Sequence, residues 1–111
     1  MAYDRDLANR IREELAGEEG VIEKAMFGGL AFLVSGNMAV SASGQGGLLL
    51  RINPDDSDDV LARPHTRLME MRGREMPGWI RVAPEGVETK RELAKWVRQG
   101  VAFARTLPPK G

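Results

Sequence analysis

The sequence predicts a single α+β domain, an antiparallel sheet flanked by helices near the two ends of the chain. Apolar runs separated by glycine-containing turns between residues 23 and 43 indicate a meander of three strands. Helical patterns occupy residues 4–15 and 89–105. A chain of 111 residues has the length of one domain and can bury a core without disulfides. We therefore expect residues 1–111 to form one two-layer domain.

The first helix is predicted from Asp4 to about Leu15. Asp4 can cap it, and the apolar residues repeat at helical spacing as Leu7, Ala8, Ile11 and Leu15. Glycines at 17 and 20 end this helix and lead into a first strand at about residues 21–27.

Two glycine-containing bends shape the meander. Gly28 and Gly29 separate two apolar runs, and Gly36 with Asn37 forms a second turn signal, because both residue types tolerate positive φ. Between the bends, residues 30–34 are apolar on both faces, which predicts a central strand. Residues 38–43 alternate in size and polarity, which predicts a strand with one face less buried.

The second half of the chain predicts a strand at 48–52, a helix, a hairpin and a last helix. Asn53 and Pro54 open the second helix, and Arg63 before Pro64 ends it. A short strand at 68–71 and a strand at 79–82 are predicted to be joined by a turn at residues 76–79, which contains Gly78.

The last helix has the clearest pattern. Thr89 and Glu92 have the spacing of a capping box, and apolar residues then recur at helical spacing. Gly100 lies on this apolar stripe, where it predicts close packing of the helix on the sheet. The tryptophans and phenylalanines are interpreted as core residues. The methionines are interpreted as core filling, although Met69, Met71 and Met76 could instead form a partner surface.

Composition argues against several kinds of site. The chain has no cysteine and one histidine, His65, so thiolate or histidine metal sites and a cysteine nucleophile have no basis, and we expect no cofactor. The glycines at 28–29 and at 44–47 do not lead into a helix or a Lys-Ser/Thr pair, so they are interpreted as structural turns rather than phosphate loops. No apolar run could cross a membrane and the start does not resemble a signal peptide, so we expect a cytoplasmic protein.

Charge is balanced overall but divided along the chain. Residues 1–60 contain eleven acids and five bases, whereas residues 61–111 contain five acids and eleven bases. Five basic side chains crowd one segment of the second half, and these are the candidate partner surface: Arg63, His65, Arg67, Arg72 and Arg74. The alternative is that these arginines pair with nearby aspartates and glutamates. A net charge of zero and the absence of a nucleic-acid-binding motif favour an acidic protein partner over direct nucleic-acid binding.

Several motifs, in order, resemble the N-terminal domain of the TfoX (Sxy) family of bacterial competence regulators. They are Met26-Phe27-Gly28-Gly29-Leu30-Ala31-Phe32, Gly36-Asn37-Met38, Leu61-Ala62-Arg63-Pro64-His65, Gly73-Arg74, Gly78-Trp79 and Trp96-Val97 with Gly100. The resemblance implies a helix-flanked antiparallel sheet similar to secretion chaperones. It implies no catalytic residues.

Full-length members of that family carry a further C-terminal domain and act as transcriptional co-activators. The sequence ends at Gly111, so we expect the N-terminal-like domain alone, without that second domain. The resemblance implies a non-enzymatic, regulatory domain that binds a protein partner, with the transcription machinery as a candidate. The alternative is a small-ligand binder or an enzyme that uses the face near Arg63, His65 and Arg74. We also expect a homodimer paired through an edge strand near Met69 or near Leu48.

Overall fold

The computed structural model describes residues 3–26 and 28–109. Its α-helices are α1 (Arg5–Glu14), α2 (Ser57–Leu61) and α3 (Lys90–Thr106), and its 3-10 helices are η1 (Pro54–Asp56) and η2 (Pro84–Val87). Its strands are β1 (Val21–Met26), β2 (Gly29–Val34), β3 (Asn37–Ala42), β4 (Leu48–Arg51), β5 (Thr66–Met71) and β6 (Arg74–Val82). The predicted α+β class and the predicted order of elements are confirmed. The end of the first predicted strand, Phe27, lies outside the described residues.

The strands form one antiparallel sheet in the order β1-β2-β3-β4-β6-β5. Its edges are β1 and β5. The strand containing Met69 is therefore an edge, as predicted, but the prediction of an edge at Leu48 is wrong. Leu48 pairs with Ala42 on one side and Val82 on the other, because β6 returns beside β4 and leaves β5 outermost.

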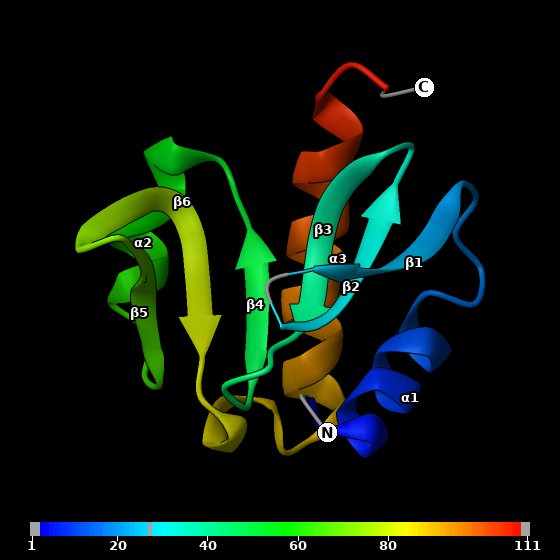
Figure 1. Ribbon diagram of the computed structural model, residues 1–111, viewed down its shortest axis with the longest axis horizontal. Coiled ribbons are helices and arrows are strands. Elements are labelled where there is room, and N and C mark those ends of the chain that lie inside the picture. Colours follow the sequence, from blue (N-terminus) through cyan, green and yellow to red (C-terminus); the bar gives the residue numbers. More distant parts are fainter. Residues whose placement is uncertain (1–2, 27, 110–111) are drawn as a thin grey trace.

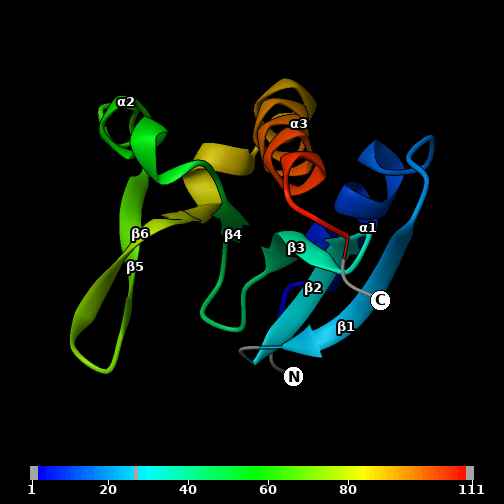
Figure 2. The same ribbon diagram turned by 90° about the horizontal axis from the view of Figure 1, so that it is seen from above.

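The helices cover one side of the sheet (Figures 1 and 2). The long helix α3 packs on β3 and β4, and α1 lies against α3 and β3. Gly100 brings α3 close to the sheet: a Cβ at this position would lie 2.6 Å from the Ala39 carbonyl oxygen. The core between helices and sheet contains the apolar stripes of both helices, including Ile11, Leu93 and Trp96.

The helix starts are fixed by the residues that the sequence indicates. The Asp4 carboxylate accepts hydrogen bonds from the backbone N–H groups of Asp6 and Leu7 at the start of α1. At the start of α3, Thr89 and Glu92 form the predicted capping box. Such caps satisfy N–H groups that have no partner within the helix.

The hairpin turn between β5 and β6 differs from the prediction. It lies at Arg72 and Gly73, which both have positive φ, the combination found in tight hairpin turns. Gly78, predicted in the turn, is instead inside β6, where the pairing with β5 is irregular. Its φ is +83°, its N–H donates to Ser57 Oγ, and its carbonyl accepts from the Ile52 N–H. The Pro-Gly pair therefore bends a strand and does not end it.

The sheet is strongly bent. In Figure 2 the β1–β2 and β5–β6 hairpins both turn away from the helices, so the helix-free side of the sheet is concave. Every residue of β3 is buried, although the sequence predicts a less buried face for this strand. The prediction fails because the concave side packs on itself around Ala31, Leu33, Met38, Leu49 and Met69.

Among the described residues, no helix has the length and apolar character needed to cross a membrane.

Candidate functional site

The concave side of the sheet, which we call the helix-free face, is made by every second residue of the strands. Strand register continues one row across all six strands, from Lys24 through Ala31, Ser41, Leu49 and Arg81 to Arg67. A row this long would normally be covered by a second layer of structure. Here α1, α2 and α3 all lie on the other side (Figure 2).

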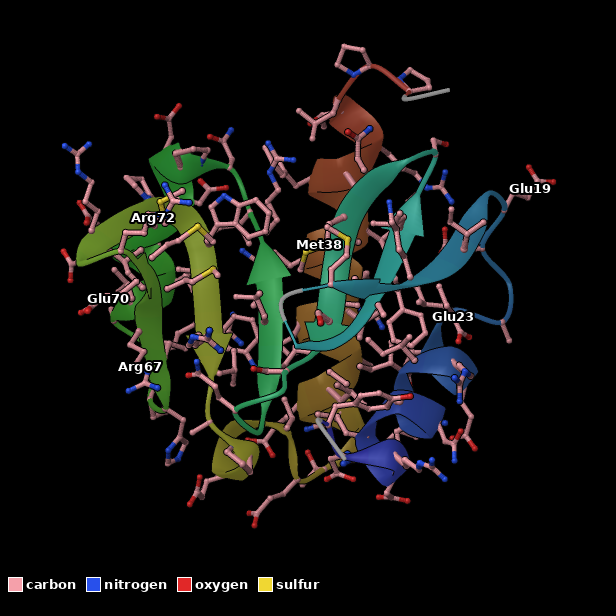
Figure 3. All side chains as sticks on the ribbon, viewed as in Figure 1. Glu19, Glu23, Met38, Arg67, Glu70 and Arg72 are labelled. Carbon is pink, nitrogen blue, oxygen red and sulfur yellow. The ribbon has the colours of Figure 1, made fainter. Side chains whose placement is uncertain are left out.

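Methionine is concentrated on the helix-free face. Met38 and Met69 lie in its buried cluster and Met26 packs against it, and Met76 is the register partner of Met69. Met71 follows on the same side of β5 and is 36% exposed. Figure 3 shows Met38 in front of β3, on the side away from α3. Methionine is unbranched and adapts its shape to different neighbours, so it is common on surfaces that bind other proteins.

Apolar exposure is greatest toward the rims of this face. Ile22 of β1, the register partner of Leu33, is 56% exposed. Trp79 of β6 is half-buried, and the guanidinium carbon of Arg51 lies 5.2 Å from the centre of its ring. The same guanidinium lies 5.7 Å from the ring of Phe103 on α3. Arg51 therefore spans two aromatic rings at one end of the sheet.

The charge on the helix-free face has a single sign at the strand positions. Alternation and register place five cations there: Lys24, Arg51, Arg67, Arg74 and Arg81. The strand carboxylates of Glu23, Glu70 and Glu75 stand at positions of the opposite parity, although Glu70 also lines the hollow beside Arg67 and Arg81. Glu23 lies on the helix side, where it forms an ion pair with Arg12 of α1.

The basic segment singled out from the sequence does not form one cluster. Arg63 lies with its guanidinium carbon 3.8 Å from the centre of the Trp96 ring, so it packs against the helix side. His65 is exposed just before β5, with φ of +67°, whereas Arg72 and Arg74 lie at the far end of the hairpin. Strand register places Arg67 and Arg74 on the helix-free face. None of the ion pairs in the described part of the chain includes any of these arginines.

Lys24, Arg51 and Arg81 were not predicted from the sequence as residues of this surface. The period-2 alternation that puts Trp79 and Arg81 on one side of a strand was available from the sequence. The pairing order that brings this side next to Arg67 and Leu49 was not.

The glycines predicted as turns serve two different purposes. Gly28 and Gly36 have φ of +75° and +86°, which favours glycine. Gly29 has no positive φ, but a Cβ there would lie 2.1 Å from the Ala42 carbonyl oxygen. Asn37 begins β3, and its buried side-chain amide donates to the Pro108 carbonyl oxygen at 3.0 Å.

Two adjoining hollows lie beside Arg67 and Arg81. One of about 290 Å³ is lined by these arginines with Gln45, Leu68 and Glu70, and one of about 370 Å³ extends from them past His65 to Pro84. Both are open to solvent. Among the described residues there is no group of three or more histidine, cysteine, aspartate or glutamate side chains that could bind a metal ion.

Comparison with known proteins gives one result. The family model described as the TfoX N-terminal domain matches residues 13–104, which is most of the chain. No curated protein and no solved structure matches.

Proposed function

The chain belongs to the TfoX N-terminal domain family, and from this premise we propose that it is a regulatory, non-enzymatic domain that binds a protein partner through the helix-free face. The observation that carries this proposal is the uncovered concave side of the sheet. Met38 and Met69 are buried at the centre of that side. Around them lie the exposed Ile22 and Met71, the partly buried Trp79, and cations at the strand positions.

The composition of the face suggests the chemistry of the partner. A segment with apolar side chains would pack on Ile22, Met71 and Trp79. Acidic groups beside that segment would meet Lys24 and the arginines. Such complementarity increases the rate of association and weakens with salt, since the screening length is about 10 Å at 0.1 M. The family supports a role in regulation, with the transcription machinery as the candidate partner.

The alternative of a small-ligand site built from Arg63, His65 and Arg74 has less support. Arg63 is engaged with Trp96, and His65 and Arg74 lie at opposite ends of the β5–β6 hairpin. A small-ligand site needs polar groups that converge in one concave place, and these three do not converge.

A capture experiment tests the proposal. The wild-type domain, the double variant Ile22→Glu/Met71→Glu and the control Ala102→Glu are used as bait in lysate of the native cell. Ala102 is exposed on α3, away from the helix-free face. We expect wild type and control to retain the same partner, and the double variant to lose it while keeping its circular dichroism spectrum and melting temperature.

Equal capture by all three baits would place the partner surface elsewhere on the domain. A partner retained by wild type and control is then identified by mass spectrometry. Its binding should weaken as salt rises from 0.05 to about 0.5 M, because the proposed contact includes exposed charges.

A further inference from the structure

Arg67 of β5 and Arg81 of β6 form a cross-strand pair of like charge. Their Cα atoms are direct register partners on neighbouring strands, so two guanidinium groups leave the same side of the sheet. Like charges directly opposite each other in a sheet are destabilising. No ion pair in the described part of the chain neutralises either of them. Burial of Arg81, and after it the charge of Arg67, lowers the pKa of Arg81.

The loop between β3 and β4 is fixed beside this pair. Gly46 and Gly47 have φ of +91° and +71°, and the Ser43 N–H donates to the Gly47 carbonyl. A Cβ on Gly47 would lie 2.2 Å from the Val82 carbonyl oxygen, so the loop sits directly on the end of β6. The position of Ser43 and Gln45 relative to Arg81 is therefore set by backbone contacts.

The hydrogen bonds around Ser43 use only part of the hydrogen-bonding capacity of Arg81. The Ser43 Oγ accepts from the Gln45 backbone N–H at 3.1 Å and from Arg81 Nη1 at 2.8 Å. The Ser43 hydroxyl hydrogen has no acceptor among the described residues. The other side-chain N–H groups of Arg81 make no hydrogen bond to a described residue. The Arg67 side chain makes no hydrogen bond to a described residue either. Arg67, Arg81 and Gln45 line the hollow of about 290 Å³. Ser43 is buried behind it, where its hydroxyl oxygen holds the Arg81 guanidinium.

We propose that Arg67, Arg81 and Gln45 form an oxyanion-binding site that takes a phosphate or carboxylate group, with Ser43 positioning Arg81. Guanidinium groups match the spacing of oxygens in such anions and bind them with two parallel hydrogen bonds. A bound anion would compensate the repulsion between the arginines. Glu70 also lines the hollow without pairing with them, so its carboxylate opposes the bound anion. The site does not depend on the protein partner proposed above.

The test is a titration of the isotope-labelled domain, followed by NMR. Inorganic phosphate, acetate and chloride are added separately at constant ionic strength. We expect saturable shifts at Ser43, Gln45, Arg67 and Arg81 with phosphate or with acetate, with a dissociation constant on the order of 1 mM, as two charge-assisted hydrogen bonds would give. The anion that binds more tightly identifies the group the site prefers. Chloride should give no saturable shift.

Variants distinguish a site from general attraction of anions to a basic surface. Arg67→Gln and Arg81→Gln should each weaken binding by about tenfold or more, since each removes one charge-assisted donor group. Arg74→Gln removes the same charge at the far end of the hairpin and should change the affinity little. Glu70→Gln should tighten binding. Without phosphate or acetate, Arg67→Gln should melt at or above the wild-type temperature, because it removes the repulsion with Arg81.

Two results would overturn the proposal. One is a linear shift without saturation for both phosphate and acetate. The other is an equal loss of affinity in Arg74→Gln and Arg67→Gln, which would mean that anions are attracted by the general positive charge of the surface and not by a specific site. If neither occurs but no protein partner is captured by the helix-free face, the anion site stands and the proposed function fails.

Discussion

On the helix-covered side of the sheet, Phe32, Leu50 and Ile80 are fully buried beneath the helices. On the helix-free side a smaller cluster is buried, and Trp79 and Met26 at its border are only partly buried. The helix-covered side is formed by branched and aromatic side chains, whose rigid shapes suit one fixed packing. The other side is rich in methionine and positive charge. The difference agrees with the proposal that the helix-covered side provides most of the stability of the domain and that the helix-free side binds the partner.

The two tryptophans offer the largest test of this comparison, because each belongs to a different side. Trp96 is 3% exposed, donates its indole N–H to the Gly86 carbonyl and carries Arg63 on its ring. Trp96→Ala should cost about 3–5 kcal/mol of unfolding free energy. Trp79→Ala should cost about 1–2 kcal/mol, since its side chain is half-buried. Urea denaturation measures both, and equal losses would contradict the division between the sides.

The glycines at the first bend give a second, smaller test. Gly29→Ala should cost about 3 kcal/mol, at the upper end of overpacking penalties, because the added Cβ meets the Ala42 carbonyl oxygen of the neighbouring strand. Gly28→Ala meets nothing within 4 Å and should cost about 1 kcal/mol, from its positive φ. Thermal unfolding of the two variants compares them. A larger loss for Gly28→Ala would show that bend geometry, and not strand contact, limits this position.

The sequence predicted most of the helices and strands, but it did not predict the order in which the strands pair. Caps such as Asp4 and Thr89 act locally, and the stripe of the last helix is a local periodicity, so both can be found from neighbouring residues. The insertion of β6 beside β4 depends on contacts between distant segments, so the edge at Leu48 was predicted wrongly. Pro77 and Gly78 have the composition of a turn, but their bonding partners, Ser57 and Ile52, come from other elements.

The candidate site was predictable only in part, for the same reason. Arg67 was found because it lies in a basic segment of the chain. Arg81 and Lys24 belong to its row only through the pairing of six strands, which no local pattern contains. Arg63 was grouped with Arg67 by position in the sequence, but its guanidinium is held by Trp96, a contact between residues far apart in the chain.

Exposed residues of the helix-free face should matter little for stability. Ile22→Ser should change the unfolding free energy by less than about 0.5 kcal/mol, because a surface substitution removes little buried area. Chemical denaturation of the purified domain provides the measurement. A loss above about 2 kcal/mol would mean that this rim belongs to the core, and that loss of capture by a variant at Ile22 reflects unfolding.

The smallest expected effect is that of the Arg12–Glu23 ion pair on the melting temperature in acid. The hydrogen bond from Arg12 lowers the pKa of Glu23 below the ordinary value of 4.5. The stabilisation is therefore complete above pH 4.5 and is lost as pH falls through the lowered pKa. Glu23→Gln should flatten the decline of melting temperature below this pH, whereas Glu13→Gln, which makes no ion pair among the described residues, should leave it unchanged. Identical acid profiles for wild type and Glu23→Gln would contradict this role.

The most direct test of the central claim follows the methionine methyl groups of the domain by NMR while the captured partner is added. If the helix-free face is the binding surface, the isotope-labelled methyls of Met26, Met38, Met69, Met71 and Met76 should shift or broaden in proportion to bound partner. Backbone amides on the exposed side of α3 should stay unchanged. Unchanged methionine methyls together with shifted α3 amides would contradict the account, because the partner would then bind the helix layer.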